Sequence, residues 1–149
     1  MVEPSGGDQN PVPMDPAALQ TALDGVAADY TWRLGLRVVA VRPDGVELAL
    51  PVAAHLVHGG GVVCGQSLLA AADTAMLVAM IAAQGGFRPM TTVQLGFTFL
   101  RPVPGDTGEI ALDARVLRTG KTLCYGTVDF IVGVERRLVG QATTSYSLL

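Results

Sequence analysis

Charged residues are scarce in this chain, and positive charge is not in excess. They make up 15% of the 149 residues, and 10 Lys and Arg against 13 Asp and Glu leave a formal net charge of −3. A protein that binds nucleic acid needs a basic surface, and the arginines here are scattered rather than clustered. We therefore expect no nucleic-acid partner.

Metal ligands and disulfide partners are also few. The chain has two cysteines, Cys64 and Cys124, and two histidines, and they lack the spacing of a zinc site. No secretory signal precedes them, which favours reduced thiols and a cytoplasmic protein. We expect no metal and no cofactor.

Hydrophobic residues, by contrast, make up half of the chain. A chain of 149 residues forms one domain, and so much apolar surface predicts that a second subunit covers part of it. We expect a homodimer or a dimer of dimers. Residues 1–13 are polar and rich in Pro and Gly, which predicts a flexible tail before a single domain at 14–149.

The longest apolar stretch, residues 65–83, predicts a central helix. Leu, Ala and Met dominate it, and Gly85 and Gly86 end it. Because it is apolar on nearly every face, we expect protein to surround it. A membrane span is disfavoured, since the stretch is shorter than the ~20 residues that a span needs and carries Asp73 near its middle.

Asp73 is the one charged residue of this stretch. An ionised carboxylate in apolar surroundings costs several kcal/mol unless it is paired or reaches a wet cleft. Two roles remain open: a structural hydrogen bond, or a general base or nucleophile.

Strand patterns lie on both sides of this helix. A hairpin is predicted at 34–52 around the turn at 43–45, and four more strands at 91–102, 108–118, 122–132 and 137–146. In the first of these four, alternation places Val93, Leu95 and Phe97 on one face and Thr92 on the other. A short helix begins at Asp15 and Pro16.

The order of these elements predicts an α+β fold. About six strands with short turns form an antiparallel sheet, which can bury an apolar helix only by curling around it.

Three segments carry a family resemblance: AAADTAM in the helix, TTVQLGFTFLRPVPGD after it, and ARVLRTGKTLCYGTVDF. Over roughly residues 34–147 the chain resembles the hotdog-fold thioesterases of the phenylacetic-acid type, the PaaI-like proteins. The resemblance implies the hotdog fold and an acyl-CoA thioesterase, with coenzyme A as part of the substrate and each site shared between two subunits.

In that family an Asn, a His-Gly-Gly motif and a helical acid form the site. The glycine amide polarises the thioester carbonyl, and the partner's acid is base or nucleophile. Here His58-Gly59-Gly60 lies fifteen residues before Asp73, whereas the family spacing is about nine, which matches Cys64-Gly65-Gln66 instead. The resemblance then implies that Gly65 is the oxyanion donor, with Gln66 beside it, and that His58 takes the Asn position. The plain alternatives are a helix start at Gly65 and a loop hydrogen bond at His58.

The remaining candidates come from the same resemblance. Thr92 would place the attacking water, with Thr91 as its weaker neighbour. Arg118 and Lys121 flank a turn where relatives meet the phosphates of coenzyme A, and Arg101 is a further candidate. Structural roles in a strand and in solvated turns explain these residues as well.

The predicted function is thus an acyl-CoA thioesterase in which Asp73 directs water at a carbonyl held by the Gly65 amide. A non-catalytic acyl-CoA or acyl-carrier binding protein is the alternative, because the His-Gly-Gly spacing is altered. A hotdog hydratase or dehydratase is a third possibility, with His58 and Asp73 as its acid and base. The sequence leaves the acyl group undefined.

Overall fold

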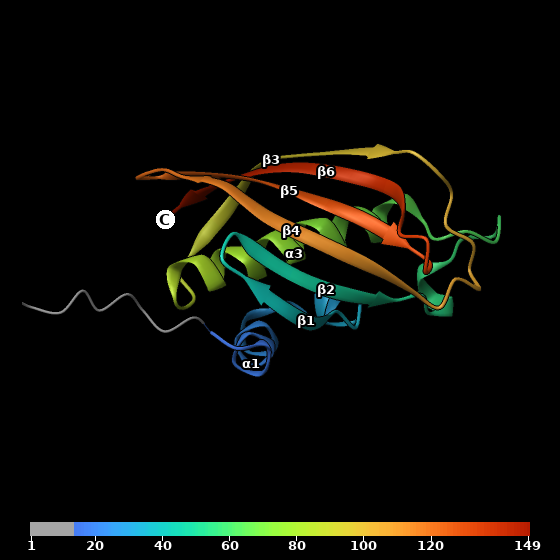
Figure 1. The fold of residues 1–149 in the computed structure, drawn as a ribbon, viewed down its shortest axis with the longest axis horizontal. Coiled ribbons are helices and arrows are strands. Elements are labelled where there is room, and N and C mark those ends of the chain that lie inside the picture. The colour runs from blue at the N-terminus through green and yellow to red at the C-terminus, as the bar shows by residue number, and fades with distance from the viewer. Residues whose placement is uncertain (1–13) are drawn as a thin grey trace, which may run out of the picture.

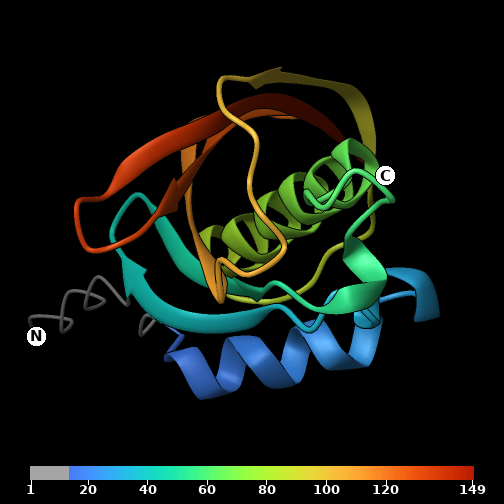
Figure 2. The ribbon, with the colours of Figure 1, turned by 90° about the vertical axis from the view of Figure 1, so that its right-hand side faces the viewer.

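A curved antiparallel sheet of six strands surrounds one long helix in the computed structural model, which describes residues 14–149 (Figures 1 and 2). The strand order is β1-β2-β4-β5-β6-β3. The elements are α1 (Pro16–Val26), α2 (Asp29–Trp32), β1 (Arg37–Arg42), β2 (Gly45–Pro51), a 3-10 turn (Ala54–Leu56), α3 (Gly65–Gln84), β3 (Met90–Phe99), β4 (Glu109–Thr119), β5 (Leu123–Val132) and β6 (Arg137–Leu148). The predicted α+β hotdog fold is confirmed. The predicted tail, 1–13, lies outside the described residues.

The first helix begins as the sequence predicts. The Asp15 carboxylate accepts a hydrogen bond from the Ala18 amide at 2.7 Å, and Pro16 opens α1. Leu19 and Leu23 are buried, and α1 runs along the outside of β1 (Figure 2). The short α2 and the 3-10 turn were not predicted, because elements of four residues or fewer show no periodic pattern.

The central helix α3 ends at Gly85, which adopts the left-handed conformation with φ 72°. The sheet covers most of α3, but a half-buried stripe at helical spacing includes Ala70, Asp73 and Leu77. Protein of the same chain thus surrounds α3 as predicted, except along this half-buried stripe. By length and composition alone, α3 could cross a membrane, with a mean hydropathy of 1.6. Its packing inside the sheet is typical of a core helix.

A β-bulge changes which face of β3 carries Thr92. The register with β6 shifts between Thr92 and Gln94, so that Thr92 lies opposite Tyr146 and Leu95 lies opposite Thr144. Thr92 and Leu95 therefore both face α3, and Val93 is 58% exposed. The predicted alternation, which put Thr92 on the face away from Leu95, is wrong at this point.

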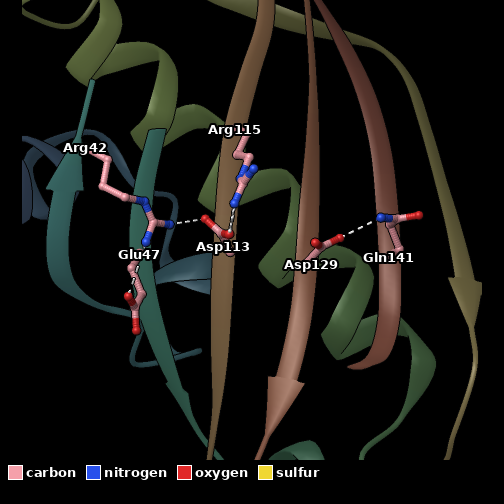
Figure 3. Close-up of polar contacts among 6 residues, drawn as sticks. All are labelled: Arg42, Glu47, Asp113, Arg115, Asp129 and Gln141. Carbon is pink, nitrogen blue, oxygen red and sulfur yellow. Dashed lines mark hydrogen bonds and ion pairs between the residues drawn. The ribbon is translucent and has the colours of Figure 1, made fainter. Parts of the chain in front are cut away.

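A cluster of polar side chains lies on the outer face of the sheet, across β1, β2, β4, β5 and β6 (Figure 3). Asp113 on β4 lies directly opposite Asp129 on β5, an arrangement that like charges make unfavourable. Arg42 and Arg115 both pair with Asp113, and Gln141 donates to Asp129 at 2.7 Å. The arginines and Gln141 thus offset the repulsion between Asp113 and Asp129 on the outer face. The opposite, apolar face of the sheet packs on α3.

Candidate functional site

Two hydroxyl groups hold the carboxylate of Asp73. The Thr92 hydroxyl donates to Oδ1 at 2.9 Å, and the Tyr146 hydroxyl lies 2.5 Å from the same oxygen. The Tyr146 hydroxyl is also 2.6 Å from the backbone carbonyl oxygen of Asp73. The three side chains come from α3, β3 and β6, so the site depends on the pairing of β3 with β6. No hydrogen bond reaches Oδ2 within residues 14–149.

A small hollow, which we call the Asp73 hollow, opens beside this carboxylate. Its volume is about 180 Å³, and its walls are residues 26–28 and Thr31 at the α1–α2 corner together with Leu77 and Met90. Its lining is about half polar: Thr31, Thr74, Thr92 and Tyr146 join Asp73, beside the apolar residues 26–28, Leu77 and Met90. A carboxylate in such a mixed hollow can meet both water and an apolar group.

A larger cavity of about 620 Å³ lies between α1, α2, the loop before β1 and the 3-10 turn. It holds Asp24, which accepts from Gln20 at 3.1 Å, and His55, whose Nε2 lies 2.9 Å from the Arg33 carbonyl oxygen. Asp73, the acid that the family resemblance implies, lines the smaller hollow and not this cavity, so we take the smaller hollow as the candidate site.

Burial raises the pKa of Tyr146 above its ordinary value of 10.0, and the charge of Asp73 and the hydrogen bond between them raise it further. Tyr146 is only 3% exposed. Its hydroxyl therefore stays protonated and acts as a donor to the carboxylate.

The N-terminus of α3 offers a second polar feature. In the part of the chain that the structure describes, the amides of Gly65 and Gln66 donate to no acceptor, whereas the Cys64 amide donates to Leu56 O at 2.8 Å. Free amides at a helix N-terminus bind negative charge. The Phe99 ring lies 3.3 Å from the position that a Cβ on Gly65 would occupy, so the ring and the amide are neighbours.

Gly65 and Asp73 do not meet within one chain. They are eight residues apart on the same helix, which at 1.5 Å per residue is about 12 Å. One thioester carbonyl therefore cannot contact both groups of one subunit.

His58 lies in the loop that leads to α3. It is exposed, and its Nδ1 accepts from the Gly60 amide at 2.8 Å. A Cβ on Gly60 would lie 2.6 Å from the imidazole ring, and Gly61 has φ +82°. Local turn geometry thus accounts for two of the three loop glycines, and no hydrogen bond links His58 to Asp73.

The proposed coenzyme A contacts lie elsewhere. Arg118 and Lys121 are exposed and form no ion pair within the described residues. Their turn lies at the end of the sheet where α3 ends, opposite the end where α3 begins (Figure 1). Arg101 donates to Leu138 O at 2.7 Å, which ties a loop to β6. Thr91 is exposed beside Thr92.

Tyr146 is the residue that sequence reasoning missed. It stands last in a predicted strand, and alternation along that strand gives only its face. Its contact with Asp73 depends on the pairing of β6 with β3, strands separated by about forty residues, for which the sequence carries no local signal.

Comparison with known proteins agrees with this architecture. Residues 56–138 match the model of the thioesterase superfamily. The chain is similar to the conserved protein PA5202 of Pseudomonas aeruginosa, with 29% identity, a TM-score of 0.75, and coverage of 85% of this chain and 98% of that one.

Two further solved structures share the fold. The thioesterase HI1161 of Haemophilus influenzae has a TM-score of 0.77 at 20% identity, with 88% of this chain and 90% of that one covered. The PaaI protein from the phenylacetic acid degradation operon of E. coli has a TM-score of 0.74 at 16% identity, with 91% and 96% covered. Comparison with functionally curated proteins gave no match.

The raised pKa of Tyr146 makes a prediction about alkaline stability. The folded state holds this proton more tightly than the unfolded state, so its contribution is complete below about pH 10 and is lost as the pH rises further. From pH 8 to 11, wild type should lose about 1.4 kcal/mol more unfolding free energy than Tyr146→Phe. Urea unfolding at each pH measures this, and parallel losses in both proteins would contradict it.

Proposed function

The chain belongs to the thioesterase superfamily, and we propose that it hydrolyses the thioester bond of an acyl-coenzyme A. The observation that carries this proposal is the carboxylate of Asp73, which lines a hollow of mixed polar and apolar character and, among the described residues, has two hydrogen bonds to Oδ1 and none to Oδ2. A thioester is already electrophilic, so a positioned base and an oxyanion donor can suffice for its hydrolysis.

In the proposed reaction, Asp73 accepts a proton from water as the water oxygen attacks the carbonyl carbon. The carbonyl oxygen becomes an oxyanion, and the amide of Gly65 donates to it at the positive end of α3. The oxyanion then collapses, the carbon–sulfur bond breaks, and the coenzyme A thiolate leaves with the proton that Asp73 took. The products are a carboxylic acid and free coenzyme A.

A second copy of the chain is part of this proposal. Because Gly65 and Asp73 of one chain are about 12 Å apart, the amide of one subunit must act with the carboxylate of another. β3 is one of the two edge strands of the sheet, and its exposed apolar residues include Val93 and Phe99, at 58% and 52%. A long apolar edge strand is a surface for pairing with another strand.

Antiparallel pairing of two copies through β3 would also give a role to the turn between β4 and β5, which Arg118 and Lys121 flank. Such pairing sets the end of α3 in one subunit beside the start of α3 in the other. Arg118 and Lys121 of one subunit would then lie on the side of the partner's helix start, where their charges can meet the phosphates of coenzyme A.

The first test is turnover of short, medium, long and aryl acyl-CoA esters, measured as free thiol. We expect hydrolysis by wild type, and a fall in kcat of at least ~100-fold in Asp73→Asn because an amide cannot take the proton of water. Equal rates in the two proteins would refute the role of Asp73. Calorimetric binding without thiol release would favour the binding protein, the alternative that the altered glycine motif suggests.

The oxyanion donor can be removed without removing the helix. Cys64 has φ −70° and ψ 147°, a conformation that a following proline accepts, and proline is tolerated at the first helical position. Gly65→Pro should therefore lose ~100-fold in kcat, since it lacks the amide hydrogen.

Gly65→Ala is the matched control, because its Cβ meets the same Phe99 ring and its amide is intact. It should retain most of the wild-type kcat. If both variants lose activity equally, contact with Phe99 rather than the lost donor explains the effect.

The shared site predicts complementation. Mixed dimers of Asp73→Asn and Gly65→Pro subunits contain one site with both an intact amide and an intact carboxylate. After random exchange in a 1:1 mixture, about a quarter of wild-type activity should return. Thiol release before and after subunit exchange measures it, and a mixture that stays as inactive as its parents would show that sites are not shared.

A further inference from the structure

We infer that Tyr146 is a positioning residue, whose buried hydroxyl anchors Oδ1 of Asp73 and so leaves Oδ2 as the oxygen that takes the proton of the attacking water. This inference rests on the proposed function. It concerns a residue outside the motif segments on which the family resemblance depends.

The first step is the number of donors on one oxygen. The rotation of an aspartate carboxylate about its last side-chain bond is broad, so one hydrogen bond defines its plane poorly. Here two hydroxyls, from Thr92 on β3 and Tyr146 on β6, contact the same oxygen at 2.9 and 2.5 Å. Oδ1 is thereby fixed, and the direction of Oδ2 is set with it.

The second step is the rigidity of the donor. Tyr146 is 3% exposed and lies in a strand paired on both sides, with β3 and with β5. Its hydroxyl is also 2.6 Å from the backbone carbonyl oxygen of Asp73, so its one hydrogen is shared between a side-chain acceptor and a main-chain acceptor of the same residue. Thr92, by contrast, is exposed on the edge strand. Tyr146 is therefore the more firmly held of the two donors.

The third step is what the hydroxyl adds beyond packing. A phenylalanine ring would fill the same place in the core, so the hydroxyl is not needed for burial of the ring. Asp73 and Tyr146 are the titratable side chains that line the hollow in the described part of the chain. Tyr146 stays protonated because its pKa is raised, so it donates throughout the range in which Asp73 acts.

Tyr146→Phe tests the inference, measured with the best ester of the acyl-CoA panel. We expect kcat to fall about tenfold with KM within about twofold, because orientation of the base is lost while substrate contacts remain. Tyr125→Phe, on the 41% exposed Tyr125 of β5, is the matched control and should leave both unchanged.

A double variant separates positioning from structure. If Tyr146 acts through Asp73, adding Tyr146→Phe to Asp73→Asn should leave the residual rate unchanged. A further tenfold loss in that background, or a wild-type kcat in the single variant, would overturn the inference.

A measurement without turnover keeps this test apart from the test of function. The carboxyl carbon resonance of Asp73, recorded by NMR at one fixed pH, should move in Tyr146→Phe because the hydrogen bond to Oδ1 is lost, and should keep its wild-type position in Tyr125→Phe. If wild type hydrolyses no ester, the proposed function fails, and the resonance still decides whether Tyr146 anchors Asp73. The same resonance position in all three proteins would overturn the anchoring.

Discussion

A carboxylate halfway along an apolar helix is the constraint on which the rest of this structure depends. Asp73 is half-buried among mostly apolar residues of α3, so its charge needs polar partners. The sheet supplies these partners. The hydroxyls of Thr92 on β3 and Tyr146 on the adjacent β6 both donate to Oδ1 of the carboxylate. The same contacts hold the helix against the sheet. The two hydroxyls that stabilise the charge of Asp73 therefore also set the direction of its second oxygen, Oδ2.

Edge strand β3 links this carboxylate to the assembly. Its bulge turns Thr92 toward α3, while Val93, the residue that the bulge displaces, is exposed on the open edge. The helix separates Asp73 from the amide of Gly65 by about 12 Å, a distance that no side-chain movement in one subunit removes. β3 thus contacts the Asp73 carboxylate through Thr92. It also offers the surface through which, in the proposed dimer, a second copy would bring its Gly65 amide to that carboxylate.

The sequence predicted those features that depend on local patterns. Residues 16–26, 65–84 and the six strands follow from caps, glycine stops and periodicity, because these signals lie within each element. The bulge at Thr92 was not predicted, since one extra residue in β3 leaves the composition of the strand unchanged. Tyr146 was not predicted either, because its role depends on pairing between distant strands. Thr92 was identified as a candidate through the family resemblance, although its predicted face was wrong.

The altered glycine motif bears on whether such a site can catalyse. An oxyanion at the start of α3 needs a backbone amide hydrogen that has no other acceptor. The side chain of residue 64 does not supply this hydrogen. Cys64-Gly65-Gln66 retains a free amide at Gly65, where the nearby Phe99 ring leaves little room for a larger residue. A histidine at position 64 would add a side chain but no backbone donor. The departure from His-Gly-Gly therefore weighs less against hydrolysis than the loss of the amide hydrogen at position 65 would.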